Sequence, residues 1–553
     1  MSVSNPVNRS TELKRGALGV GFIIFFVISA ASPLSVIAGG FPIGIMLGNG
    51  AGTPALLLLA LLVLLAFSVG YTTMSRHLTH AGGFYAFTSR GLGGLAGGAA
   101  GVLAMFAYNI LQVGLYGMFG GVVSGTLESV VGLVLPWWSY SLMAMASIAI
   151  LGYRKIDLSA RVLSVVVIAE YLAILVLDFA ILKSGGDSGI NLDAFDRSHV
   201  FSGTLVLDFA ILKSGGDSGI NLDAFDRSHV FSGTPSIGLL FCFAAFIGFE
   251  ATTIYGEEAR NPQRTIPIAT YCSVLLIGGF YALSVWSMVV GVGADKIVPM
   301  LQALQDPTTF IYGMSDHFVG PHLTQIIRVL FMVSIYAGLL AFHNAAARYF
   351  YAIGRDGHFV GPHLTQIIRV LFMVSIYAGL LAFHNAAARY FYAIGRDGLL
   401  HSLLGTTHRV HQSPHMGSAL QSLISAVVVL VFAAMGADPI LQLFAWLSNL
   451  ATLCMILLMA LTSAAVLVFF WRHPELKVGA WRGQIFPGCS CLALLVVLVL
   501  AVVHFDVLTG ASMALSYGLC VIIPMALLGG LFLAMRLRKT APQRFLALGY
   551  HKL

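Results

Sequence analysis

A carboxylate, Glu250, lies inside the apolar stretch 241–255, two residues after Gly248. A carboxylate at membrane depth is energetically costly and is usually kept for function. Glycine weakens a helix because it loses more backbone freedom on folding than any other residue. An ionisable group beside a weak point in an apolar helix is typical of the discontinuous helices of secondary transporters. We therefore expect Glu250 to sense protons or to brace an unwound segment, with a purely structural role as the alternative.

Three further carboxylates are candidates for coupling or gating. Glu170 lies within the apolar span expected over 160–183. Because a buried carboxyl group can exchange protons near neutral pH, Glu170 is a candidate for proton coupling, with a structural hydrogen bond as the alternative. Glu257 and Glu258 follow the Glu250 segment in a charged turn, where we expect either a gate latch or a solvated surface cluster. The arginines expected to pair with them in a latch are Arg76, Arg90, Arg260 and Arg264.

Polar and aromatic side chains in other apolar segments are candidates for substrate contacts. Asn109 and Gln112 recur with Tyr108 at helical spacing and are expected to hydrogen-bond a polar substrate, or to link helices instead. Trp446 is expected to close the pocket, with packing as the alternative. His384 is a candidate proton relay, although helix packing is the favoured interpretation.

Composition assigns these residues to a membrane protein. The chain has 553 residues, of which 58% are hydrophobic and 10% charged, whereas soluble domains carry about 25% charged residues. Several apolar runs exceed the ~20 residues that cross a bilayer. The net charge of +7 lies almost entirely in loops between these runs, which indicates membrane topology and no nucleic-acid partner. The apolar runs are therefore expected to lie in a lipid bilayer.

No enzyme or cofactor signature is present in the sequence. The six cysteines are scattered, without metal-ligand spacing or a disulfide framework. A P-loop, a metal cluster and a nucleophile–base motif are all missing from the sequence. We therefore expect no cofactor and no metal, and we do not expect an enzyme.

Two segments are duplicated without change. Residues 175–204 recur as 205–234, and residues 317–357 recur as 358–398. Repeat architectures have three or more diverging copies, so we favour an artificial duplication over an extended loop with an extra helix. Removal of one copy of each, 30 and 41 residues, leaves 482 residues.

With one copy of each repeat, the chain is predicted to be all-α with twelve spans. Lysine and arginine gather on one side, because only Lys183, Arg197 and Lys296 fall on the other. This bias places both termini in the cytoplasm. A thirteenth span at 322–350 would break the parity, so one copy should be displaced, half-inserted or interfacial. The expected spans are roughly 17–46, 54–74, 94–124, 136–153, 160–183, 235–255, 266–292, 364–392, 417–435, 438–470, 485–505 and 511–535.

The first and sixth spans are each expected to be broken. The first contains two prolines and Gly39-Gly40 within residues 32–42, and proline removes helix hydrogen bonds. Freed backbone groups at membrane depth are tolerated where they line a cavity. Half-helix N-termini suit a carboxylate and freed carbonyls suit an ammonium group, so two breaks can hold both ends of an amino acid; two ordinary kinks are the alternative. The substrate-binding residues expected at these breaks are Ser35, Val36, Ile37, Ala38, Gly39, Gly40, Phe246, Ile247, Gly248 and Phe249.

The motifs as a set resemble the amino acid–polyamine–organocation (APC) permease family. The matching segments are 248–250 (GFE), 257–267 (EEARNPQRTIP), 81–85 (AGGFY) and 389–398 (RYFYAIGRDG). The resemblance implies a fold of two inverted five-span repeats, two extra C-terminal spans, and uptake or exchange of amino acids or related amines, often proton-coupled. This sequence lacks the family's Gly-Ser-Gly element in the first span. Glu170 stands where several relatives carry a lysine that replaces sodium.

Together these observations predict a secondary transporter of amino acids or organic amines in the plasma membrane, which is the inner membrane in bacteria. Transport is expected to be driven by protons, with sodium as the other candidate ion. The alternatives are a polyamine or other organic-cation carrier or exchanger, and more remotely a channel or a membrane enzyme. The oligomeric state and the particular substrate stay open. The expected units are a tail at 1–16, a first repeat at 17–183, an external loop at 184–234, a second repeat at 235–470, two spans at 471–535 and a tail at 536–553.

Overall fold

The computed structural model describes most of the apolar segments of the chain. Its described part consists of helices joined by turns and short loops. Glu170, Glu258, the loop 184–234 and most of the first copy of the longer repeat lie outside it. The described residues are 19–31, 36–80, 82–132, 134–153, 235–257, 259–304, 310–318, 387–408, 414–503 and 513–549, with single residues at 175, 179, 384 and 505.

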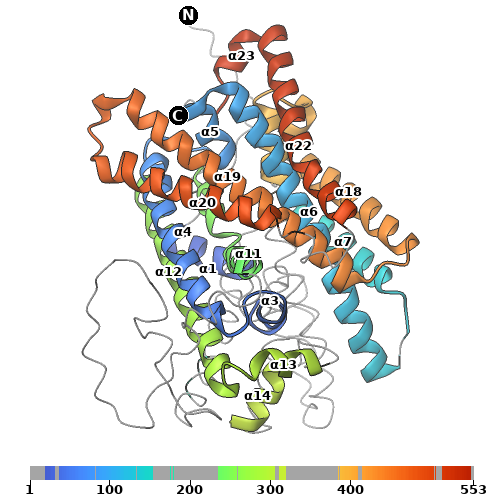
Figure 1. Ribbon diagram of the computed structural model, residues 1–553. Helices are drawn as coiled ribbons and strands as arrows, with labels where there is room; N and C mark the ends of the chain where they lie inside the picture. The colour runs from blue at the N-terminus through green and yellow to red at the C-terminus, as the bar shows by residue number, and fades with distance from the viewer. Residues whose placement is uncertain are drawn as a thin grey trace, which may run out of the picture.

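The helices follow one another along the whole chain (Figure 1). Apart from α5, α23 and the pair α13 and α14, most of them are apolar segments of the bundle. Their bounds are α1 Val20–Ala31, α3 Phe41–Leu47, α4 Thr53–Ser75, α5 Phe84–Leu92, α6 Gly94–Val131, α7 Trp137–Tyr153, α11 Pro235–Ala245, α12 Pro262–Val292, α13 Ile297–Ala303, α14 Phe310–Phe318, α18 His415–Ala434, α19 Ala445–Arg472, α20 Phe486–Val503, α22 Met513–Thr540 and α23 Pro542–Leu546.

Eight helical segments within the described residues are long and apolar enough to cross a membrane. This confirms the prediction of an all-α, multi-pass membrane protein. Of the other four expected spans, 17–46 contains α1, a π-helical turn at Val36–Gly40 and α3, and 136–153 contains the shorter helix α7. The spans expected at 160–183 and 364–392 lie mostly outside the described residues. The eight segments are Gly50–Ser75, Gly94–Ser124, Ile237–Tyr255, Pro262–Val292, His415–Ala434, Gln442–Arg472, Trp481–Val503 and Ala514–Thr540.

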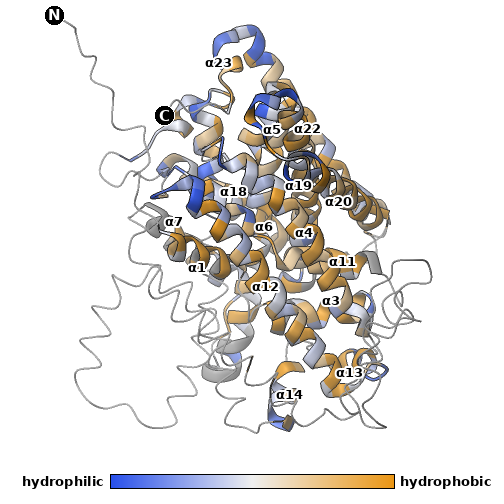
Figure 2. Ribbon diagram, turned by 90° about the vertical axis from the view of Figure 1, so that its left-hand side faces the viewer, coloured by the Kyte–Doolittle hydropathy of each residue, from blue (hydrophilic) through white to orange (hydrophobic). Residues whose placement is uncertain are grey.

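The segment that carries Glu250 lies at the centre of the bundle. Within its most apolar window, Ile237–Tyr255 is 89% buried, whereas Ala514–Thr540 is 17% buried. The exposed apolar side chains of this last segment, for example Met525 and Phe532, suit a lipid-facing surface, and its exposed basic residues Arg536, Arg538 and Lys539 lie at its C-terminal end. In Figure 2 the long helices are mainly hydrophobic, and hydrophilic residues gather towards α5 and α23 at one end. The helices α13 and α14 lie at the opposite end.

Small residues allow close approach between helices. The helix α6 packs along both α19 and α22, and α5 packs against α19. A Cβ atom added to Gly530 of α22 would lie 2.5 Å from the carbonyl oxygen of Gly98 in α6. Glycine is favoured at such contacts in membranes because it lets two backbones touch.

We expect Gly530→Val to lower the thermal midpoint of the detergent-solubilised protein, because overpacking costs about 1–3 kcal/mol. The measurement is thermal unfolding followed by fluorescence-detected size exclusion. Gly529→Val is the matched control, because a Cβ there would meet nothing within 4 Å. Equal midpoints for the two variants would contradict the close packing of α6 and α22.

Candidate functional site

The helical path through residues 235–255 changes geometry at Gly248. The helix α11 ends at Ala245, a turn covers 246–248, and a 3₁₀ helix, η7 (Phe249–Tyr255), follows. Gly248 has φ of 115°, a left-handed conformation that glycine adopts without a side-chain penalty. The Oε2 atom of Glu250 accepts a hydrogen bond from the Gly248 backbone N–H at 2.9 Å. The carboxylate therefore satisfies a backbone donor that the change in geometry frees.

Glu250 is also tied to two other helices. It is 2% exposed, and its Oε1 atom accepts a hydrogen bond from the Tyr108 hydroxyl of α6 at 2.6 Å. The Tyr71 hydroxyl of α4 donates to the Glu250 carbonyl oxygen at 3.0 Å and lies 2.5 Å from the Thr253 hydroxyl. The ring of Tyr108 stacks on Tyr390, with centroids 5.1 Å apart. Both the side chain and the backbone of Glu250 are thus held in place.

The first-span region lies against this site. The helix α1 ends at Ala31, whose carbonyl oxygen accepts a hydrogen bond from the Tyr281 hydroxyl of α12 at 3.1 Å. The Tyr281 ring also packs against Phe41 and Phe246, at centroid distances of 5.4 and 6.5 Å. A π-helical turn over Val36–Gly40 leads into α3. Because α1 contacts η7, and both the π-helical turn and α3 contact α11, the two regions singled out from the sequence are neighbours in space.

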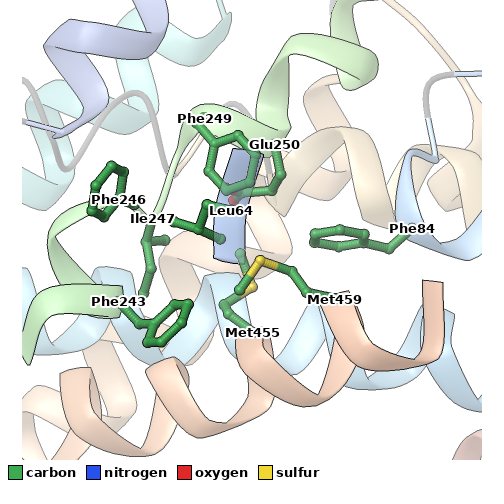
Figure 3. Close-up of a pocket in the computed structure, with 9 residues that line it drawn as sticks. All are labelled: Leu64, Phe84, Phe243, Phe246, Ile247, Phe249, Glu250, Met455 and Met459. Carbon is green, nitrogen blue, oxygen red and sulfur yellow. The ribbon is translucent and has the colours of Figure 1, made fainter. Parts of the chain in front are cut away.

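A small pocket opens beside Glu250 (Figure 3). Its free space holds about one water molecule. Side chains reach it from α4, α5, α19 and the segment 243–250. Glu250 is the one charged group among the residues that line it, which are Leu64, Phe84, Phe243, Phe246, Ile247, Phe249, Glu250, Met455 and Met459.

The structure brings part of the predicted binding set to this pocket. Phe246, Ile247 and Phe249 line it, and Gly248 contributes its N–H to Glu250. Val36, Ile37 and Gly40 lie in the neighbouring π-helical turn with Ala38 and Gly39, whereas Ser35 lies outside the described residues.

Three other predicted residues are not among those that line the pocket. The Asn109 amide donates to the carbonyl oxygen of Met105 in its own helix at 2.7 Å. The Gln112 amide donates to the Tyr116 hydroxyl at 3.0 Å and lies 3.1 Å from Nδ1 of His384. Trp446 packs against the Phe432 ring at 6.3 Å between centroids. These contacts match the alternative interpretation of links within and between helices.

His384 extends the Gln112 contacts to another helix. Its Nε2 atom lies 2.6 Å from the Ser418 hydroxyl of α18. If Gln112 donates to Nδ1, the ring proton sits on Nε2 and is given to Ser418. This arrangement satisfies both ring nitrogens of a neutral imidazole and ties α6 to α18.

A second charged site lies just after the segment Ile237–Tyr255, at Glu257. The Arg396 guanidinium donates to both Glu257 carboxylate oxygens, at 3.1 and 3.2 Å. Arg396 is not among the partners expected from the sequence, which were Arg76, Arg90, Arg260 and Arg264. Arg396 is 139 residues away in sequence, in the second copy of the longer repeat, and only folding brings it to Glu257.

Asp397 joins the same cluster to two further parts of the chain. Its Oδ2 atom accepts hydrogen bonds from the Tyr85 hydroxyl at 2.7 Å and from the Gly549 N–H at 3.2 Å, and it lies 3.4 Å from Nε2 of His80. Burial by itself would raise the pKa of Asp397. The imidazole of His80, the guanidinium of Arg396 and the Tyr85 hydroxyl outweigh burial and lower this pKa from 3.8 to about 2. The cluster therefore joins α5, the turn at 397 and the C-terminal segment.

Several of these residues were missed from the sequence. Tyr71, Tyr281, Met455 and Met459 carry no local signal, because aromatic and methionine residues are common throughout apolar helices. Tyr108, in contrast, was singled out from the sequence together with Asn109 and Gln112, because it lies four residues before Gln112 on one helical face.

Fold and site together define a helical membrane protein with a small, nearly apolar site around one carboxylate. The amino acid permease family matches residues 23–362, which is more than half of the chain, and a second amino acid permease family matches residues 358–526. The chain therefore belongs to the amino acid permease family, within the APC group. The two matches meet where the second copy of the longer repeat begins.

Curated relatives align over short parts of the chain. It is 41% identical to the human cationic amino acid transporter 4 over 46 residues, which are 8% of this chain and 7% of that protein. It is 30% identical to an uncharacterised transporter of Legionella pneumophila over 110 residues, 19% of this chain and 23% of that protein. It is 29% identical to a branched-chain amino acid permease of Lactococcus lactis over 124 residues, 22% of this chain and 24% of that protein. The chain thus spans less than a quarter of the length of each.

We expect Glu257→Gln and Arg396→Gln each to destabilise the protein by about 3–5 kcal/mol, because each leaves a poorly exposed charge without its bidentate partner. The side chains are 7% and 16% exposed. The double variant should lose less stability than the sum of the two single losses. Thermal midpoints in detergent measure this, and Glu475→Gln in the exposed His473–Glu475 pair is the control, with no expected change. Strict additivity would contradict a direct pairing.

The contribution of the Asp397 carboxylate to the stability of the fold should be lost only at low pH. The folded-state pKa of about 2 lies below its ordinary value of 3.8, so the carboxylate stabilises the fold above about pH 4 and loses this effect as pH falls through about 2. Asp397→Asn should therefore lower the thermal midpoint both at pH 7 and at pH 5. The gap to the parent protein should shrink only below about pH 4. A gap that closes between pH 7 and pH 5 would contradict the assigned contacts.

Proposed function

We propose that this chain is a secondary transporter that moves amino acids across the membrane by alternating access, with the substrate bound between the first and sixth spans. The observation that carries the proposal is the buried carboxylate of Glu250, which bridges the Gly248 turn and Tyr108 beside a small pocket. The names of two relatives, a cationic amino acid transporter and a branched-chain amino acid permease, support an amino acid as substrate.

The proposed fold has twelve spans in two inverted five-span repeats with two additional spans. The π-helical turn Val36–Gly40 before α3 and the change of geometry from α11 to η7 support it, because they occupy corresponding places in the two halves and their regions contact each other. Main-chain groups of residues 35–40 and 246–249 are the proposed contacts for the substrate carboxylate and ammonium group. The lysine and arginine distribution supports a plasma-membrane protein with both termini in the cytoplasm.

Alternating access accounts for the small size of the pocket. A space for about one water molecule cannot hold an amino acid, so binding requires the surrounding helices to separate. The Glu257–Arg396 pair and the Asp397 contacts lie between segments that such a movement would part, and we propose that they form a gate. Glu257 lies just after the segment that carries Glu250, where a gate latch is expected from the sequence.

Proton coupling is proposed to act through Glu250, with Glu170 as the other candidate. Both Glu250 oxygens accept hydrogen bonds in this structure, so the arrangement suits the ionised form. The Gly248 N–H cannot become an acceptor, whereas the Tyr108 hydroxyl can rotate. A proton gained by Glu250 would therefore change its contacts with α6 and with the Gly248 turn. This links the charge of one residue to the geometry of the proposed binding site.

The test is uptake of labelled amino acids into proteoliposomes with and without an inward proton gradient, and with a sodium gradient instead. Saturable, gradient-dependent uptake is expected. Glu250→Gln should reduce gradient-driven accumulation at least tenfold while exchange of internal for external substrate survives. Glu475→Gln is the exposed control, and Glu170→Gln tests the second candidate. Failure to take up any amino acid or amine would contradict transport, and undiminished accumulation in both test variants would contradict coupling through these carboxylates.

A further inference from the structure

We infer that the transported amino acid has a neutral, apolar side chain, and that Met455 and Met459 determine how large this side chain can be. The inference rests on the proposed function and deepens it. It concerns the pocket beside Glu250, and it assigns Glu250 no role as a counter-charge for a cationic side chain.

The lining of the pocket is the first argument. Eight of its nine residues are apolar, and each of the nine is at most 6% exposed. A charged side chain placed there would leave water and meet only one charged group, Glu250, among otherwise apolar residues, and burial of an incompletely compensated charge is costly. An aliphatic or aromatic side chain would instead gain about 25 cal/mol for each Å² of apolar surface removed from water.

The hydrogen bonds of Glu250 are the second argument. A carboxylate offers about four lone-pair sites, whereas an ammonium group has three N–H donors and a guanidinium five. Tyr108 and the Gly248 N–H already occupy two of these sites, at 2.6 and 2.9 Å. About two sites remain, and the other lining side chains offer only the weakly accepting sulfurs of Met455 and Met459. A lysine or arginine side chain would therefore keep unsatisfied donors in a buried site.

The two methionines form the part of the pocket lining that can adjust to the substrate. Met455 and Met459 lie four residues apart on α19, so they share one face of that helix, and both extend into the pocket in Figure 3. They are 2% and 4% exposed. Methionine is unbranched and fits irregular spaces, so rotation of these two side chains can admit an apolar group where only one water fits. Their volume then sets the upper size limit of the substrate.

The experiment is competition in proteoliposomes, with labelled leucine and labelled arginine measured separately. We expect leucine, isoleucine, valine and methionine to inhibit leucine uptake at concentrations at least tenfold below those of arginine and lysine. Preference for arginine or lysine would overturn the inference while leaving amino acid transport intact. Absence of uptake for every amino acid and amine would instead contradict the proposed function.

Variants of the two methionines test the size limit. Met455→Ala and Met459→Ala should each raise the uptake of phenylalanine or tryptophan relative to valine about tenfold or more, within the 10–200-fold range typical of one or more methylene groups in an apolar pocket. Met525→Ala is the control, because Met525 is 63% exposed on α22. Size-exclusion profiles and thermal midpoints check folding, and the smaller truncation Met459→Val keeps the test open if an alanine variant unfolds. An unchanged preference in folded variants would overturn the role of these methionines.

Discussion

The hydrogen bonds of Glu250 hold the centre of this protein together. A glycine in a left-handed conformation interrupts the path from α11 to η7 and frees a backbone N–H in a region where water is scarce. An unsatisfied N–H there is costly, and the Glu250 carboxylate satisfies it. The same carboxylate accepts from Tyr108, so one side chain stabilises the turn and attaches it to α6. The break and the carboxylate therefore depend on each other.

A hydrogen bond also anchors the neighbouring first-span region, because the Tyr281 hydroxyl donates to the carbonyl oxygen of Ala31 at the end of α1. Because its ring also contacts Phe41 and Phe246, Tyr281 joins the end of α1, the start of α3 and the turn after α11. The Gly248 N–H is thus met by a side chain of its own segment, Glu250 of η7, and the Ala31 carbonyl oxygen is met by a side chain of α12, Tyr281.

The charged cluster at Arg396 and Asp397 connects the site region to the surface of the bundle. It unites Glu257, Tyr85, the segment that ends in Gly549 and two adjacent residues of the longer repeat. The second copy of that repeat supplies these two residues to the cluster and Tyr390 to the Tyr108 stack. The described part of this copy, residues 384 and 387–398, therefore occupies a place in the core that the remainder of the fold requires.

The sequence by itself determined the membrane class, the apolar segments, the family and the weak point at Gly248, because hydropathy, glycine and short motifs act locally. It also identified Glu250 and Glu257 as candidate functional residues. Only the tertiary structure decided their partners. Tyr108 lies 142 residues from Glu250 and Arg396 lies 139 residues from Glu257, and an apolar helix carries no signal for which of its faces meets a distant carboxylate. For the same reason Asn109, Gln112 and Trp446 have polar or aromatic character that the sequence could detect, but their contacts were set by packing between helices.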